Sequence, residues 1–201
     1  TQTQQKDAET ARRRSGGLVL RTWNTAAEFR NFRVLGRDGK PLGANLNSLN
    51  AWKGERSGDW SMVDGAIRQS NPNGDLSLRT GDMKLYNCTL TFEARKLNGK
   101  EGFIVGLRDK TDSAVFVNFG GWNNTKHGLQ HPDGGIWRQE NGRVDDNAWN
   151  RVRIDIFNDY ISVQLNGRTV FSRVRTPKQD SPDFFSVCGY DQKTKEYIVK
   201  C

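Results

Sequence analysis

The feature that most constrains this chain is a strict alternation of apolar and polar side chains in its last third. In residues 151–157 and again in 160–165, every second residue is aliphatic and branched: Val152, Ile154, Ile156, Ile161, Val163 and Leu165. Because successive residues of a strand point to opposite faces, this period of two predicts strands. Asn158-Asp159 predicts a turn between them. The segment is therefore expected to form two antiparallel strands with one buried and one solvated face.

The rest of the chain follows the same plan of short strands and tight turns. Asp64-Gly65 and Asn166-Gly167 are dipeptides that favour the positive φ angles of two-residue hairpins. Further strands are predicted at residues 60–63, 66–69, 86–97, 102–108, 114–119 and 168–174. Since no helical pattern separates the strands, the sequence predicts an all-β sandwich, or jelly roll, of two antiparallel sheets.

The chain of 201 residues is long enough for one large β domain. Residues 1–17 are polar and include the basic run at residues 12–14, so we expect a disordered N-terminal tail. Residues 18–201 are expected to form a single sandwich domain. The sequence begins with Thr1 and shows no signal peptide, and it is compatible with export.

Charge and hydropathy exclude two classes of partner. The net charge is +8, but the basic residues are spread along the chain and interleaved with acidic ones. A nucleic-acid-binding protein usually concentrates its basic residues on one stripe, so no nucleic-acid partner is expected. No stretch reaches the roughly eighteen apolar residues that a membrane-spanning helix needs, and no membrane partner is expected.

Three cysteines are too few and too widely spaced for a disulfide framework. Cys88 alternates in phase with Leu90 and Phe92, which predicts a small core residue. At most one disulfide can form within the chain, and the states of Cys88, Cys188 and Cys201 stay open.

No cofactor is expected, and the metal question stays open. The two histidines, His127 and His131, have neither cysteines nor an acidic cluster beside them, so zinc is not predicted. Sandwiches of this kind can hold a structural calcium ion through loop oxygens, and the sequence does not locate a site for one.

The segment from residue 118 to 130 concentrates groups that suit sugars. Sugars are held by flat aromatic faces against their C–H groups and by planar polar groups against their hydroxyls. Gly120-Gly121 allows a sharp turn that presents Trp122. Candidate hydrogen-bonding partners around it are Asn118, Asn123, Thr125, His127 and Gln130. The alternative is that Trp122 plugs the sandwich edge and the polar groups satisfy a turn.

The other tryptophans divide by their surroundings. Trp60 and Trp149 stand at strand starts, and we expect both in the core. Trp52 and Trp137 have polar or glycine-rich neighbours and are candidates for an exposed sugar platform, with burial as the alternative.

Arg108 is a further candidate for ligand binding. At the end of a predicted strand, its guanidinium could clamp a pair of hydroxyls or a uronate carboxylate. The alternative is a surface ion pair with Asp109 or Asp112.

No catalytic residue is predicted. A glycosidase needs two carboxyl groups that flank one bond. The Glu-x-Asp-x-x-Glu spacing that places acids on one strand face is missing, and the carboxylates considered are single and scattered: Glu93, Glu101, Asp109 and Glu140. The chain is therefore expected to hold sugar without cleaving it.

Several segments resemble a known family. Residues 116–130, with Asn-Phe-Gly-Gly-Trp-Asn-Asn-Thr-Lys-His at their centre, resemble the concanavalin A-like, non-catalytic domain attached to many bacterial α-L-arabinofuranosidases. Residues 16–29, 60–69 and 101–105 follow the same pattern in order. The resemblance implies a secreted or periplasmic carbohydrate-binding accessory domain whose partners are a polysaccharide or oligosaccharide and a separate catalytic glycoside hydrolase domain.

Two other functions and one topological expectation remain. A small sandwich-fold glycoside hydrolase would place two carboxylates across a cleft, and a structural spacer or interaction domain would lack an exposed aromatic residue near polar groups. Residues 18–34 resemble the closing strand pair of related sandwiches. This implies a permuted order in which they lie beside strands from the C-terminal half of the chain.

Overall fold

The computed structural model describes most of the chain between Gly16 and Arg175 and one hairpin beyond it. The described residues are 16–43, 45–56, 58–81, 83, 85, 87–108, 114–131, 133–157, 160–175, 187–191 and 196–200. The side chains of residues 55, 56, 108, 114, 187–191 and 196–200 lie outside the description. Of the tail expected at residues 1–17, residues 1–15 lie outside the description.

The described residues form strands almost throughout. The strands are β1 Leu18–Trp23, β2 Thr25–Gly36, β3 Trp52–Arg56, β4 Trp60–Val63, β5 Ala66–Gln69, β6 Asp75–Thr80, β7 Cys88–Gly99, β8 Phe103–Arg108, β9 Ala114–Gly120, β10 Lys126–Gln130, β11 Ile136–Asn141, β12 Asn150–Phe157, β13 Tyr160–Leu165, β14 Arg168–Arg175, β15 Val187–Asp191 and β16 Glu196–Lys200. Two short turns are η1 Leu49–Ala51 and α2 Gly121–Asn124.

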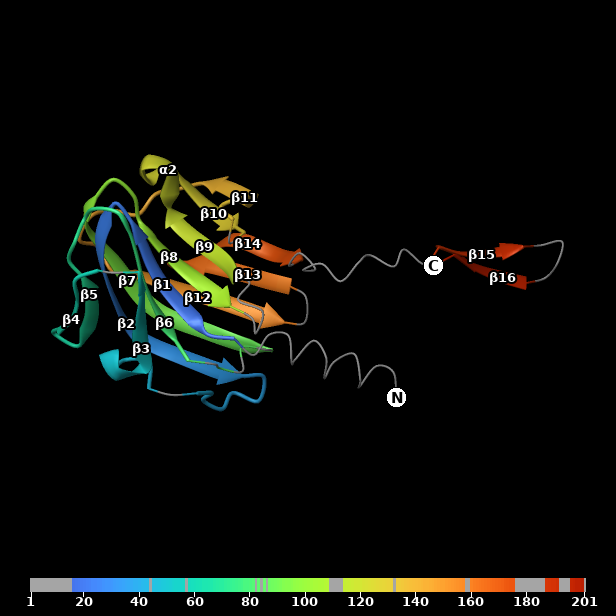
Figure 1. Ribbon diagram of the computed structural model, residues 1–201, viewed down its shortest axis with the longest axis horizontal. Coiled ribbons are helices and arrows are strands. Elements are labelled where there is room, and N and C mark those ends of the chain that lie inside the picture. Colours follow the sequence, from blue (N-terminus) through green and yellow to red (C-terminus); the bar gives the residue numbers. More distant parts are fainter. Residues whose placement is uncertain are drawn as a thin grey trace.

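Two antiparallel sheets make the sandwich (Figure 1). The first sheet has the order β11-β10-β9-β8-β1-β6-β3, and the second has the order β14-β13-β12-β7-β2-β5-β4. The hairpin β15–β16 forms a sheet of its own. The predicted fold class is confirmed.

The predicted hairpins form where the turn dipeptides stand. Asp64 and Gly65 join β4 to β5, and Asn166 and Gly167 join β13 to β14. All four residues have positive φ, between 49° and 79°, which is the geometry that a two-residue hairpin needs. β12 and β13 pair from Val152–Leu165 to Phe157–Tyr160, in line with their alternation.

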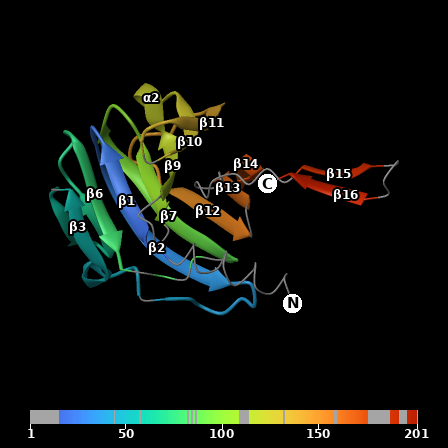
Figure 2. The same ribbon diagram turned by 45° about the vertical axis from the view of Figure 1, so that its right-hand side comes forward.

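The first two strands occupy interior positions, each third from one edge of its sheet, which corrects the predicted arrangement. β1 lies between β6 and β8, and β2 lies between β5 and β7. The turned view shows β1 beside β6 in one layer and β2 beside β7 in the other (Figure 2). The neighbours therefore come from the middle of the chain, and only β8 begins just past its midpoint. The resemblance of residues 18–34 to the closing strand pair of related sandwiches did not identify these neighbouring strands.

The core lies between the inner faces of the two sheets. Phe29 of β2 meets Phe103 of β8 edge to face with 6.0 Å between ring centroids, and Phe103 also packs on Phe119 of β9. Cys88 is fully buried among these layers, as predicted, and burial raises the pKa of its thiol to about 12. The thiol is therefore protonated and inert at physiological pH.

The core expectation holds for Trp60 but not for Trp149. Trp60 packs against the core and stacks on Phe29 at 6.5 Å. The indole of Trp149 lies outside the core, against the guanidinium groups of Arg30 and Arg95, which are 3.7 and 4.6 Å from its ring centroid. The prediction for Trp149 is wrong because Trp149 immediately precedes β12 in phase with its outward-facing arginines.

Gly16 and Gly17, which were assigned to the tail, are buried. The backbone oxygen of Gly16 accepts a hydrogen bond from the amide of Met83, and a side chain at Gly17 would meet the backbone of Thr80. The packed part of the chain therefore includes these two residues. Among the described residues, no helix is long and apolar enough to cross a membrane.

Candidate sugar-binding pocket

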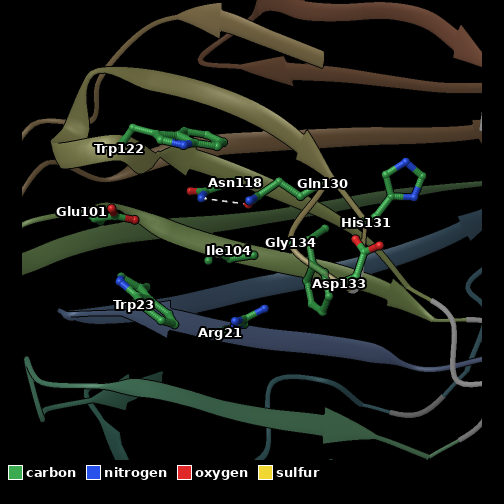
Figure 3. Close-up of a pocket in the computed structure, with 11 residues that line it drawn as sticks. Arg21, Trp23, Glu101, Ile104, Asn118, Trp122, Gln130, His131, Asp133 and Gly134 are labelled. Carbon is green, nitrogen blue, oxygen red and sulfur yellow. Dashed lines mark hydrogen bonds between the residues drawn. The ribbon is translucent and has the colours of Figure 1, made fainter. Parts of the chain in front are cut away.

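An open pocket of about 300 Å³ lies on the outer face of the first sheet. Its walls come from β1, β8, β9 and β10, the turn α2 and the loop between β10 and β11 (Figure 3). The lining residues are Arg21, Trp23, Glu101, Ile104, Phe116, Asn118, Trp122, Gln130, His131, Asp133 and Gly134.

Strand register places the floor of the pocket in one row. Arg21 pairs with Ile104, Ile104 with Asn118, and Asn118 with Gly128, across four neighbouring strands. Their chain neighbours point inward to the core, so these four positions face outward together. The indole of Trp122 covers Gly128, where an added Cβ would come within 2.5 Å of the ring. The row therefore begins at an arginine and ends beneath an aromatic ring.

Two tryptophans stand on opposite sides of the pocket. Trp23, at the end of β1, is 44% exposed, and Trp122 in α2 is half-buried. Figure 3 shows them on either side of Ile104. This arrangement offers two aromatic faces with a polar and aliphatic floor between them, which suits a ring that has C–H groups and hydroxyls.

Two amides line the wall below Trp122. Asn118 donates to Gln130 with 3.1 Å between Nδ2 and Oε1 (Figure 3). Asn118 is only 5% exposed, and its Oδ1 has no hydrogen-bond partner among the described residues. A buried acceptor without a partner costs free energy of folding.

Arg21 is held in place before any ligand arrives. Its guanidinium forms two hydrogen bonds to Asp75, at 2.6 and 2.9 Å, and lies 5.1 Å from the ring centroid of Phe116. The paired carboxylate neutralises most of its charge. Arg21 therefore provides fixed donors rather than a net positive field.

Two carboxylates lie at opposite ends of the pocket, Glu101 beside α2 and Asp133 in the loop after β10 (Figure 3). Burial raises the pKa of Glu101, and the backbone amides of Asn123 and Trp122, which donate to its carboxylate, partly counteract that rise. Asp133 is exposed and accepts from the amide of Gly135. His131 lies beside Asp133 in the pocket wall, and its ring is 5.9 Å from that of Trp137.

A model of the family described as "3-keto-alpha-glucoside-1,2-lyase-like domain" matches residues 39–198. The chain belongs to this family. An "Extracellular exo-alpha-L-arabinofuranosidase" of Streptomyces chartreusis is 28% identical over 194 residues, which are 92% of the chain and 23% of that protein. The chain thus spans about a quarter of this relative, and the resemblance found in the sequence is confirmed. No solved structure gives a significant match.

The domain brings three of the predicted binding residues together. Asn118, Trp122 and Gln130 line one pocket, and Trp122 is half-exposed as expected. Asn123 and Thr125 are exposed outside the lining, where the hydroxyl of Thr125 donates to the backbone oxygen of Trp122 at 2.7 Å.

Two other candidates face away from the pocket, and a third lies beside it without lining it. His127 is buried on the core side, where burial lowers its pKa and its Nδ1 accepts from the amide of Gly120 at 3.1 Å. Trp52 is buried, with its Nε1 donating to the backbone oxygen of Leu46. Trp137 is partly buried against the core, and its ring lies 5.9 Å from that of His131 in the pocket wall. Strand phase turns the rings of His127 and Trp52 inward, so the exposure considered for Trp52 is not observed. The side chain of Arg108 lies outside the description.

The sequence interpretation missed the other half of the pocket. Arg21 and Trp23 alternate with the buried Leu18 and Leu20, so their outward direction could be read from the sequence. Their place beside Ile104 could not, because it requires the pairing of β1 with β8. Among the described residues, no three histidine, cysteine, aspartate or glutamate side chains are grouped to hold a metal ion.

Proposed function

We propose that this domain binds one sugar residue of a polysaccharide or oligosaccharide in the pocket between Trp23 and Trp122. The observation that carries the proposal is the pair of indoles on opposite sides of a floor that carries amides and a fixed guanidinium. Aromatic faces and planar polar groups together are what sugar recognition requires. A structural spacer would have no reason to keep Trp23 exposed beside such groups.

The relative extends the proposal to a substrate class and a context. Its printed name describes an extracellular enzyme that acts on α-L-arabinofuranosides. We therefore propose an arabinose-containing polysaccharide as ligand, a catalytic glycoside hydrolase domain as partner, and secretion or periplasmic export as the setting. The charges in the pocket favour a neutral sugar over an acidic one, because Glu101 and Asp133 line the pocket and Asp75 already pairs with Arg21.

Calorimetric titration with arabino-oligosaccharides tests this function. Trp122→Ala should weaken binding by about 1–3 kcal/mol, as expected for the loss of an aromatic anchor, and should leave the melting temperature nearly unchanged. Trp149→Ala is the matched control, since this indole lies against Arg30 and Arg95 outside the pocket. Unchanged affinity in a folded Trp122→Ala protein would contradict the proposal.

One observation supports a second candidate, an enzyme. Glu101 and Asp133 share the pocket, and burial raises the pKa of Glu101 towards the range of a general acid or base. The family is itself described by a lyase-like activity. Incubation with arabinosides and with 3-keto-glucosides, followed by product analysis, tests it. Turnover that is lost in both Glu101→Gln and Asp133→Asn would favour the enzyme over the binding domain.

A further inference from the structure

The position of Trp122 depends on a backbone that needs support. Trp122, Asn123 and Asn124 are three successive non-glycine residues with φ between 52° and 59°. L-residues rarely adopt this left-handed conformation, and it persists only where the surroundings impose it. The turn that presents Trp122 must therefore be held from outside.

The end of the turn is held by neutral groups. The side chain of Asn124 accepts from the amide of Val144 at 2.9 Å and donates to its carbonyl at 2.8 Å, in the manner of a strand. The hydroxyl of Thr125 donates to the carbonyl of Trp122. These hydrogen bonds fix the C-terminal end of the turn. They do not involve the backbone amides of Trp122 and Asn123 at its start.

The start of the turn is held by a carboxylate. Oε1 of Glu101 accepts from the amide of Asn123 at 3.4 Å, and the amide of Trp122 also donates to this carboxylate. Successive amides in such a turn form a concave site for an anion, which Glu101 fills. The chain before β8 thus reaches across to the loop that carries the aromatic wall.

We propose that Glu101 is a positioning residue: its carboxylate holds the amides of Trp122 and Asn123 and thereby fixes the indole that contacts the sugar. This inference rests on the proposed function. The indole is confined on its other side by Gly128, where even a methyl group would overlap the ring. Trp122 is therefore confined on two sides: the Glu101 carboxylate contacts its backbone, and Gly128 of β10 lies beneath its side chain.

The charge of Glu101 gives the inference a pH signature. A carboxylate accepts more strongly than a carboxylic acid, so protonation should loosen the start of the turn and lower affinity. The raised pKa places this change at a less acidic pH than for an ordinary glutamate. The other titratable groups of the pocket are Arg21, His131 and Asp133, and Lys100 precedes Glu101 in the chain.

Amide resonances of the sugar-free domain test the contact directly. In a pH titration followed by nuclear magnetic resonance, the amide protons of Trp122 and Asn123 should shift together with one midpoint above the usual glutamate range. Glu101→Gln should abolish this shared titration, and Glu140→Gln, which changes an exposed carboxylate on β11, should leave it intact. The same titration persisting in Glu101→Gln would overturn the proposal.

Affinity for arabino-oligosaccharides supplies the second readout. Removing one hydrogen-bonded contact should weaken binding about three- to tenfold in Glu101→Ala, and Glu101→Gln, which keeps an acceptor oxygen, should recover part of the loss. Wild-type affinity should fall on acidification, and this Glu101-dependent fall should vanish in Glu101→Gln. Thermal melts confirm that each variant is folded. Equal affinity and equal pH dependence in all three proteins would overturn the proposal.

Gly128→Ala examines the opposite side of the indole. Its added methyl should displace the ring of Trp122 and weaken sugar binding while the amide titration of Trp122 and Asn123 persists. If wild-type protein binds no sugar but the amides still titrate with Glu101, the proposed function fails and the hold of Glu101 on the turn stands. If sugar binds but the titration of the Trp122 and Asn123 amides does not depend on Glu101, only the positioning role fails.

Discussion

At the scale of single residues, two tryptophans exchange the roles that their neighbours suggest. Trp52 follows a polar, glycine-rich stretch, yet its ring packs on Phe32 at 5.6 Å and its Nε1 finds the carbonyl of Leu46. Trp23 follows an apolar strand and is nevertheless exposed. Whether a side chain is buried depends on which face of the strand it occupies and on which strand lies beside it. The composition of the local sequence gives neither of these.

Trp52→Ala should therefore destabilise the domain without touching the pocket. Truncation of a buried tryptophan costs about 3–5 kcal/mol of unfolding free energy. Urea unfolding measures the loss, and sugar affinity under native conditions should match that of wild type. A loss below 1 kcal/mol would show that the ring is not part of the core.

Trp23→Ala should show the opposite pattern. An exposed ring contributes little to folding, so the urea midpoint should stay close to that of wild type, while sugar affinity should fall by about 1–3 kcal/mol. Calorimetry and unfolding on the same preparation check both parts. Unaltered affinity would place the sugar against Trp122 alone.

Glu101 should link stability to pH in a defined direction. Burial raises its folded-state pKa above the unfolded value, so its favourable contribution is complete at acid pH and is lost as pH rises through the folded pKa. The melting temperature of wild type should consequently fall relative to that of Glu101→Gln as pH rises through that pKa. Melts of both proteins from acid to neutral pH measure this difference. A difference that stays constant with pH, or that changes in the opposite direction, would contradict the direction.

At the scale of elements, alternation and turn chemistry predicted half of the described strands to within a few residues: β4, β5, β7, β8, β9, β12, β13 and β14. β12, β13 and both glycine-containing hairpins follow from the sequence because their signals are local. The pairing of β1 with β8 joins residues more than eighty positions apart, and no local signal specifies it. The same limit explains the site: the residues of α2 and β10 could be grouped from the sequence, whereas Arg21 and Trp23 could not be added to them.

Deletion of the first two strands should abolish folding. Removing residues 1–34 takes away β1 and most of β2, which leaves β6, β8, β5 and β7 without their central neighbours. Removing residues 1–15 should leave the melting temperature nearly unchanged, because that stretch is polar. Calorimetric melts compare the two truncations. A cooperative transition in the longer one would contradict the central position of these strands.

At the scale of the whole molecule, the domain combines an open pocket on one sheet face with two carboxylates at the opposite ends of that pocket. We expect no release of reducing sugar from arabinan or arabinoxylan, because no catalytic acid pair is indicated by the sequence. A reducing-end assay over long incubation checks this expectation. Steady hydrolysis that disappears in Glu101→Gln would replace the binding role with a catalytic one.

The central position of β1 and β2 also has a consequence for how the chain is synthesised. Only Asn24 separates β1 from β2, so the chain enters both layers at once. Both strands are synthesised before any of their partners, which extend as far as Arg108. β5 and β6 supply a neighbour on one side of each strand by Thr80, but the neighbours on the other side, β7 and β8, are complete only when about half of the 201 residues have been made. Nascent chains that stall in this interval should be prone to aggregation, and neither layer can be completed before the other has begun.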